Sequence, residues 1–341
     1  MLDRYSRQIL FQPIGQAGQE RLRAATVTLI GCGALGTVLA NNLCRAGIGK
    51  LIIADRDFVE LNNLQRQILF DEEDVKKRLP KAIAATEKLR RVNSDVQIEA
   101  LVEDINAAGI EDLVRTSDLL LDATDNFETR YLLNDVCIKL QRPWIYSGVI
   151  ASYGVTMNIL PGSTPCLRCV FPEMPLPGTT PTCDTAGVLN GIVGTICGIA
   201  STEALKILLG SEKVSHALTC IDLWENTSER LELPRQPDCP ACGQHHFEFL
   251  DTLNSGSATT LCGRNAVQVR GHTGQRGGVT LNFAELAQRL QPLGTVNYNS
   301  YLLRFQVDGY DLTIFPDARA IIKGTADEHV ARTLYARYIG M

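Results

Sequence analysis

The sequence predicts an α/β fold, in which a doubly wound and mainly parallel sheet is followed by a small C-terminal α+β domain. Strand-like and helix-like segments alternate through the first half of the chain, and several predicted strands are continuously apolar, whereas 96–101 alternates apolar and polar residues. A GxGxxG motif also lies between a predicted strand and a predicted helix. Strands that are apolar along their whole length are typical of a sheet covered by helices on both faces.

The elements of the first domain are marked by apolar runs and by the glycines and prolines that bound them. Strands are predicted at 26–30, 51–54, 96–101, 119–122 and 144–146, and helices at 37–45 and 80–92. The mostly apolar stretch 188–209 is long enough to span a membrane, but it carries Glu203, Lys206 and three glycines. These residues favour a buried helical region over a membrane span.

Changes in composition along the chain predict the domain organisation. A Pro/Thr/Gly-rich stretch at 172–187 predicts a long exposed loop within the first domain, which we place at residues 1–250. The segment 251–260, DTLNSGSATT, has the composition of a linker. Residues 261–341 are expected to form the small α+β domain.

Capping and turn signals predict the elements of the small domain. Asn282 is placed to cap one helix, and the capping box at 325–328 is placed to open another. The pair Asp308-Gly309 separates two apolar runs, which is a strong signal for a β-hairpin. A further short strand is predicted at 320–322.

Charge and cysteine content narrow the classes of protein. The 33 basic and 38 acidic residues give a net charge of −5. The chain therefore lacks the excess of basic residues that is typical of nucleic-acid-binding proteins. The first residues lack the basic and apolar pattern of a signal peptide, which predicts a cytoplasmic protein that is not bound to a membrane. Eleven cysteines, an odd number, fit reduced thiols, metal ligands or a catalytic thiol better than a disulfide framework.

The GxGxxG motif predicts a nucleotide-binding loop in a Rossmann-like sheet. Its glycines, Gly31, Gly33 and Gly36, permit a tight turn and let phosphate approach backbone N–H groups at a helix N-terminus. Asp55 follows the next strand, 24 residues after Gly31, where an acid can bind a ribose. By itself, this pattern is typical of an NAD-dependent oxidoreductase.

Further polar segments change that interpretation. Segments that can converge at the carboxyl ends of parallel strands carry Asn63, Arg66, Lys81 and Asp125. Two cations balance charge on a triphosphate and a carboxylate holds Mg²⁺, so this set suits adenylyl transfer and has no use in hydride transfer. Each residue alone has an ordinary alternative: a turn for Asn63, a solvated charge for Arg66 or Lys81, and a helix cap for Asp125.

Two CxxC pairs predict a zinc site. Each pair can place two thiolates on one tetrahedral metal, and four thiolates leave no open coordination position. The metal is therefore expected to be structural rather than catalytic. A redox disulfide or unrelated buried thiols are the alternatives. The four predicted ligands are Cys166, Cys169, Cys239 and Cys242.

The order of these motifs resembles the ubiquitin-activating-like ThiF/MoeB family of adenylyltransferases. The matching segments are RYSRQI at 4–9, the GxGxxG, NLQRQ at 63–67, Pro80-Lys81, TDN at 124–126, the two CxxC pairs and CDTAGV at 183–188. They lie within residues 1–247. One position departs from the family pattern: Arg78 stands two residues before Pro80, where the family often has glycine.

The resemblance implies an activity and a role for each residue of the site. The family uses ATP and Mg²⁺ to adenylate the C-terminal glycine of a ubiquitin-fold sulfur carrier (ThiS-like or MoaD-like), which ends in Gly-Gly and serves thiamin thiazole or molybdopterin synthesis. The implied roles are ribose binding for Asp55, triphosphate binding for Asn63, Arg66 and Lys81, Mg²⁺ binding for Asp125, and insertion into the partner's nucleotide site of a homodimer for Arg7. A separate sulfur donor is expected, because the chain has no obvious rhodanese domain.

Cys183 lies outside the metal pairs, in the Pro/Thr-rich stretch. In some family members the matching cysteine takes part in thioester or acyl-disulfide chemistry with the carrier, and in others it is dispensable. A thiolate can attack an acyl-adenylate because AMP is a good leaving group, and an idle exposed thiol is the alternative. Two rival functions stay open for the chain as a whole: an NAD-dependent oxidoreductase, and a non-catalytic scaffold, against which the retained Arg66, Lys81 and Asp125 argue.

Overall fold

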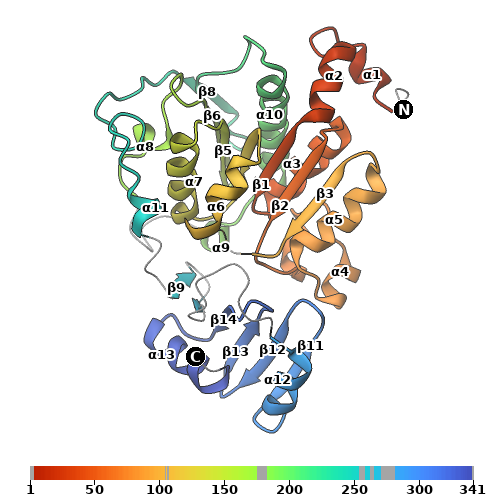
Figure 1. Cartoon of the computed structure of the whole chain (residues 1–341), viewed down its shortest axis with the longest axis vertical. Coiled ribbons are helices and arrows are strands. Elements are labelled where there is room, and N and C mark those ends of the chain that lie inside the picture. The colour runs from red at the N-terminus through yellow and green to blue at the C-terminus, as the bar shows by residue number, and fades with distance from the viewer. Residues whose placement is uncertain are drawn as a thin grey trace. The chain divides into compact units, whose positions relative to one another are not determined.

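The computed structural model describes residues 4–103, 105, 107–174, 183–252, 258–261, 265–269 and 281–339. The chain divides into two compact units, and Figure 1 colours it from red at the N-terminus to blue at the C-terminus. The first unit comprises residues 1–175 and 186–251, and the second comprises residues 176–185 and 252–341. The predicted domain boundaries stay a prediction, and residues 258–260 of the predicted linker lie in a strand.

An eight-stranded sheet forms the centre of the first unit. Its strand order is β3-β2-β1-β4-β5-β6-β7-β8, with parallel pairs from β3 to β5 and antiparallel pairs from β5 to β8. The strands are β1 (Thr26–Ile30), β2 (Lys50–Ala54), β3 (Gln97–Leu101), β4 (Leu119–Asp122), β5 (Trp144–Ile150), β6 (Tyr153–Ile159), β7 (Leu218–Asp222) and β8 (Thr227–Leu231). The predicted α/β fold is confirmed, but β6 to β8 were not predicted.

Helices cover both faces of the parallel part of the sheet (Figure 1). The helices of this unit and the short η1 are α1 (Ser6–Ile9), α2 (Gly15–Ala24), α3 (Ala34–Ala46), η1 (Leu61–Asn63), α4 (Glu72–Lys77), α5 (Lys81–Val92), α6 (Ala107–Arg115), α7 (Phe127–Lys139), α8 (Leu167–Val170), α10 (Asn190–Leu209) and α11 (Glu248–Thr252). α3 packs against α5 and α10, and α6 packs against α7. Right-handed crossovers place these two groups on opposite faces, because the strand order reverses between β1 and β4. Doubly wound sheets bind ligands at the carboxyl ends of strands at such a reversal.

Capping residues set the ends of two helices near this reversal. Asn126 caps α7, because its side-chain oxygen accepts a hydrogen bond from the backbone N–H of Thr129 at 2.9 Å. The alternative that Asp125 caps this helix is therefore wrong. Arg78 ends α4 in the left-handed conformation, with a φ of 51°. This conformation favours glycine, which is the residue that the family often has at this position.

The 20-residue helix α10 is long and apolar enough to cross a membrane by length and composition. In this structure it packs against α3, β5 and β6, and one face, which includes Ile192, Ile196 and Ala200, is buried in the core. The buried carboxylate of Glu203 accepts hydrogen bonds from the Asn158 side chain at 2.7 Å and the Ser215 backbone N–H at 2.8 Å. The prediction of a buried helical region is therefore confirmed.

The described part of the second unit is an antiparallel sheet covered by helices on one face. The strand order is β11-β12-β13-β14-β10-β9. Its elements are β9 (Ala258–Leu261), β10 (Ala266–Val269), α12 (Phe283–Leu290), β11 (Thr295–Tyr298), β12 (Leu303–Val307), β13 (Tyr310–Ile314), β14 (Ala320–Lys323) and α13 (Glu328–Tyr338). Leu286, Phe305 and Leu334 share its apolar core. The α+β prediction is confirmed, including the hairpin at Asp308-Gly309, where both residues have positive φ.

Candidate functional site

The glycine-rich loop joins β1 to the N-terminus of α3 and packs closely on the end of β4. Gly31 has a φ of 91°, and a Cβ atom there would lie 2.6 Å from the carbonyl oxygen of Ala123. A Cβ on Gly36 would collide with the carbonyl of Gly31. Glycine is therefore required at both positions, and the loop presents backbone N–H groups at the start of α3, as an anion-binding loop does.

Asp55 ties the glycine-rich loop to the end of β2. One carboxylate oxygen accepts a hydrogen bond from the backbone N–H of Cys32 at 2.6 Å, and the other accepts one from the N–H of Asp57 at 2.7 Å. Burial raises the pKa of Asp55, and the nearby Lys81 ammonium opposes that rise. Asp55 therefore stands beside the loop where its predicted role requires it, and it also fixes the loop's backbone.

Lys81 is buried beside the end of β2, so it is not a solvated surface charge. Its ammonium lies 3.0 Å from a carboxylate oxygen of Asp57, and its backbone N–H donates to the Asp57 carbonyl at 2.9 Å. Phe58 and Pro80 form an antiparallel bridge that aligns the two segments. The sequence had given Asp57 no role. The only sequence signal for Asp57 was its position, two residues after Asp55.

The NLQRQ segment lies next to the glycine-rich loop. Asn63 is buried and its side-chain oxygen accepts a hydrogen bond from the Glu60 N–H at 3.1 Å, so it has the turn role named as its alternative. Arg66 donates to the Asn62 carbonyl at 2.8 Å. The buried Gln67 faces the loop, because its amide nitrogen lies 3.9 Å from where a Cβ on Gly33 would be.

Gln67 lies beside the glycine-rich loop and was not among the site residues predicted from the sequence. Among the described residues, its side-chain oxygen has no hydrogen-bond partner. A buried amide oxygen without a partner is costly, so a donor from a bound molecule or from water would stabilise it. The only sequence signal was its place at the end of the NLQRQ motif.

The segments after β1, β2 and β4 meet at one edge of the sheet, because β1 pairs with both β2 and β4. Ala123 and Thr124 touch the glycine-rich loop at Gly31, and Asp125 follows them. The structure therefore brings together the glycine-rich loop, Asp55, Lys81 and the Asp125 loop, as the strand positions predict.

Arg7 is not brought to this edge within its own chain. α1 is anchored at the C-terminal end of α3, where the Tyr5 ring packs against Gly47 and the Gln8 amide donates to the Ala46 carbonyl at 2.9 Å. The hydroxyl of Tyr5 also accepts a hydrogen bond from the Asn93 side chain at 2.9 Å. The glycine-rich loop lies at the other end of this 13-residue helix, about 20 Å away.

Cys183 opens the short helix α9 (Cys183–Ala186), and its side chain is half-buried. Residue 183 belongs to the second compact unit, whereas the glycine-rich loop belongs to the first. Its chemical role stays a prediction.

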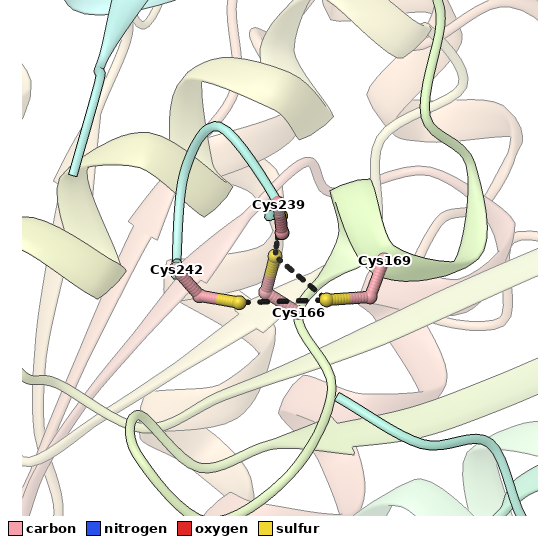
Figure 2. A group of neighbouring side chains, drawn as sticks. All are labelled: Cys166, Cys169, Cys239 and Cys242. Carbon is pink, nitrogen blue, oxygen red and sulfur yellow. Dashed lines mark hydrogen bonds between the residues drawn. The ribbon is translucent and has the colours of Figure 1, made fainter. Parts of the chain in front are cut away.

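The four cysteines of the CxxC pairs form one cluster, in which all four sulfur atoms lie within 4.8 Å of one another (Figure 2). The Sγ–Sγ distances are 3.9 Å for Cys166 and Cys169, 3.6 Å for Cys166 and Cys239, and 3.4 Å for Cys169 and Cys242. Four thiolates at 2.3 Å from a tetrahedral zinc would be about 3.8 Å apart. The cluster therefore fits a zinc ion and has the complete ligand set of a structural site.

The backbone around the cluster is shaped for thiolate ligands. The N–H of Gln236 points at the sulfur of Cys169 at 3.4 Å, as expected for a charged sulfur. The N–H of Gly243 donates to the Cys239 carbonyl at 2.9 Å, and a Cβ on Gly243 would collide with the Pro237 carbonyl. These contacts make a tight turn that brings the second pair to the first.

The fold and these sites define an α/β nucleotide-binding protein with a four-cysteine metal centre. The chain belongs to the ThiF family, whose model matches residues 5–241. Over 343 aligned residues it is 43% identical to the sulfur carrier protein ThiS adenylyltransferase of Bacillus subtilis, and the match covers 100% of both chains. It is 39% identical to the SAMP-activating enzyme E1 of Haloferax volcanii, over 74% of this chain and 93% of that protein.

Solved structures with a similar fold include E. coli MccB in complex with MccA-N7isoASN. The TM-score is 0.62 at 23% sequence identity, and the match covers 71% of this chain and 75% of that one. At this identity the likeness shows the shared fold alone.

Proposed function

We propose that this protein uses ATP to adenylate the C-terminal glycine of a ubiquitin-fold sulfur carrier. The observation that carries the proposal is the buried Lys81 beside the glycine-rich loop, at the edge where the Asp125 loop also ends. The Asp57 carboxylate meets this ammonium at 3.0 Å, and a triphosphate bound at the glycine-rich loop would be a second anion for it. A hydride transferase binds no triphosphate, so under the NAD-dependent alternative Lys81 would act only as the ion-pair partner of Asp57.

In the proposed reaction, the carrier's terminal carboxylate attacks the α-phosphorus of ATP, pyrophosphate leaves, and an acyl-adenylate forms. The start of α3 binds phosphate through backbone N–H groups, and Lys81 and Arg66 balance the charge that builds on the triphosphate. Gln67 donates to a phosphate oxygen or accepts from the nucleotide. Asp125 would hold Mg²⁺, which supplies further charge balance when it is bound.

Asp55 can bind the ribose while it holds the glycine-rich loop. Each carboxylate oxygen accepts one backbone hydrogen bond, from Cys32 or Asp57. A carboxylate oxygen has two acceptor positions, so one on each oxygen is still available for a ribose hydroxyl. Nucleotide binding therefore adds to the present contacts of Asp55 and does not break them.

A homodimer is part of the proposal, because Arg7 is held about 20 Å from its own chain's glycine-rich loop. Leu10 and Phe11, which follow α1, are 72% and 61% exposed. Exposed apolar side chains next to a predicted catalytic arginine are the surface that a second copy would cover. Arg7 would then reach the partner's nucleotide.

The carrier to test first is ThiS-like and ends in Gly-Gly, because the full-length relative from Bacillus subtilis is named for ThiS. A MoaD-like carrier is the second choice. The activated carrier would take its sulfur from a separate donor protein in the cytoplasm, with Cys183 as the thiol that could meet the acyl-adenylate. Zinc would hold the Cys166 and Cys239 segments together and take no part in adenylation.

ATP–pyrophosphate exchange with each purified carrier tests this function, with Asp125→Ala as the active-site variant. Asp112→Ala, an exposed acid on α6, is the matched control. We expect carrier-dependent exchange in the parent protein and the control, and a loss of about 10²-fold or more in Asp125→Ala. Binding of NADH without binding of ATP, together with no exchange with either carrier, would overturn the proposal.

A further inference from the structure

A buried ion pair lies directly beneath the loop that carries Asp125. Asp122, the last residue of β4, is 1% exposed. One of its carboxylate oxygens accepts hydrogen bonds from the N–H and the hydroxyl of Thr124, at 2.9 and 2.7 Å. Its other oxygen accepts from the Nε of Arg130 at 3.2 Å. One acid therefore fixes the start of the loop and the first turns of α7 at the same time.

Arg130 closes the network from the helix side. Its Nη2 donates to the Thr124 carbonyl at 2.6 Å, so the guanidinium holds the peptide that leads into Asp125. The guanidinium also lies over the rings of Phe127 and Tyr146, at 5.2 and 5.3 Å from the ring centres. Together, these contacts fix the orientation of the planar guanidinium group of Arg130.

The charge of Arg130 is maintained by its neighbours. Burial is the largest single influence and disfavours the charged form, but Asp122, Tyr146 and Asp125 together outweigh it and raise the pKa of Arg130. The Asp125 carboxylate contributes in the same direction, so it lies within electrostatic reach of the guanidinium. Arg130 is thus a permanent cation behind the loop, and it is 8% exposed.

The other side of the loop is fixed by the glycine-rich loop. A Cβ on Gly31 would lie 2.6 Å from the Ala123 oxygen and 3.1 Å from the Thr124 nitrogen, so the loop packs closely against the backbone of Gly31. Residues 122–124 are therefore clamped between Gly31 and Arg130. Asp125 is the next residue along the chain.

We propose that Arg130 is a positioning residue that, with Asp122, aims the Asp125 carboxylate at the nucleotide site. The inference rests on the proposed adenylation, in which Asp125 holds Mg²⁺. A buried ion pair seldom adds much stability compared with an apolar replacement, so its value here is the orientation that it imposes. Residues that orient a metal-binding carboxylate affect metal affinity more than nucleotide affinity.

The test compares Arg130→Lys with the parent protein and with Arg115→Met, which removes an exposed arginine paired with Glu111 on α6. Lysine keeps the charge and loses the fork that reaches both Asp122 and Thr124. The measurements are the Mg²⁺ concentration for half-maximal ATP–pyrophosphate exchange, the KM for ATP at saturating Mg²⁺, and the melting temperature. We expect Arg130→Lys to need about tenfold more Mg²⁺ while the KM for ATP changes little.

A purely structural ion pair would lower the melting temperature and the amount of active protein but leave the Mg²⁺ requirement unchanged, and that result would overturn the inference. Asp122→Asn keeps the size of the side chain but replaces one of its two accepting oxygens by an amide NH₂, so it loses a contact to Thr124 or Arg130. It should shift the Mg²⁺ requirement in the same direction if Arg130→Lys is poorly folded, and an unchanged requirement there would also overturn the inference. Absence of exchange in the parent protein would instead remove the proposed function. An active parent with unaltered variants removes only the role of Arg130.

Discussion

The four-cysteine cluster and the candidate nucleotide site are built in opposite ways. The cluster comes from two short segments, and each of its sulfur atoms faces the other three. The nucleotide site comes from segments that follow three different strands, and its charged groups face one another, as Lys81 and Asp57 do. All four sulfur atoms of the cluster come from one chain. The nucleotide site instead contains charged pairs, such as Lys81 and Asp57, whose contacts a bound ligand would extend or replace.

Because the two regions are built differently, we expect one to contribute mainly to stability and the other mainly to activity. A tetrathiolate site has one use, which is to bind a metal and fix the segments around it. Paired charges at a sheet edge are positioned for a reaction, and their contribution to folding is small once desolvation is counted. Variants of the cluster should therefore cost mainly stability, and variants of the nucleotide site mainly activity.

The largest expected effect is on stability, at the cluster. Cys239→Ser should lower the free energy of unfolding by roughly 4 kcal/mol, because loss of one ligand releases the metal and the turn that carries Cys239 and Cys242. Cys220→Ser, at a buried cysteine outside the cluster, is the control and should cost less. Melting curves with and without a zinc chelator measure the effect. Equal melting temperatures with and without the chelator would show that the metal does not stabilise the fold.

The next effect is on activity, at the nucleotide site. Lys81→Met should reduce ATP–pyrophosphate exchange by about 10² to 10³-fold, because the triphosphate loses a buried cation. Its melting temperature should change less than that of Cys239→Ser, since the side chain of Asp57 is 24% exposed and water can solvate it. Lys76→Met, at an exposed lysine paired with Glu73, is the control. Normal exchange by Lys81→Met would contradict the assignment of the site.

The smallest effect concerns α7, which connects the two regions. α7 begins beside Asp125, and its Asn134 side chain accepts a hydrogen bond from the N–H of Leu167, next to the cluster, at 2.9 Å. On the same helix, burial raises the pKa of Asp135 to about 7, and the Glu248 charge adds to the rise. The N–H of Phe249 and the Arg168 charge oppose it. Asp135 is therefore largely protonated in the folded protein at pH 6.

The sign of the pH dependence follows from this shift. Between about pH 4 and pH 7 the folded state keeps a proton on Asp135 that the unfolded state releases, so the free energy of unfolding falls as the pH rises through that window. From pH 5.5 to 8 we expect a loss of about 1 to 2 kcal/mol, which Asp135→Asn should remove. Denaturant unfolding at several pH values measures it. An Asp135→Asn protein with the parent's slope would assign the dependence to other groups.

The sequence predicted the features whose causes are local. The strands β1, β2, β4 and β5 are mainly apolar runs, β3 alternates apolar and polar residues, and the spacing of the cysteines predicts the metal ligands. Strand β8 was missed because all of its residues are exposed, so no apolar pattern marks it.

The residues that were missed act through space. Asp57, Gln67 and Arg130 gain their roles from partners on other elements, and no spacing rule connects them to those partners. The cap of α7 was ambiguous for a related reason, because Asp125 and Asn126 are both good capping residues and only the backbone decides between them.

The distribution of the cysteines has a practical consequence for labelling. Burial raises the pKa of Cys44 to about 11 and also raises the pKa values of Cys32, Cys137 and Cys197. Thiols of this kind react slowly, and metal binding protects the four cluster thiols. Among the described cysteines, Cys183 is the one that is neither buried nor in the cluster. A fluorophore attached there in the zinc-bound protein would report on the surroundings of α9, with Cys262, which lies outside the described residues, replaced so that it cannot compete.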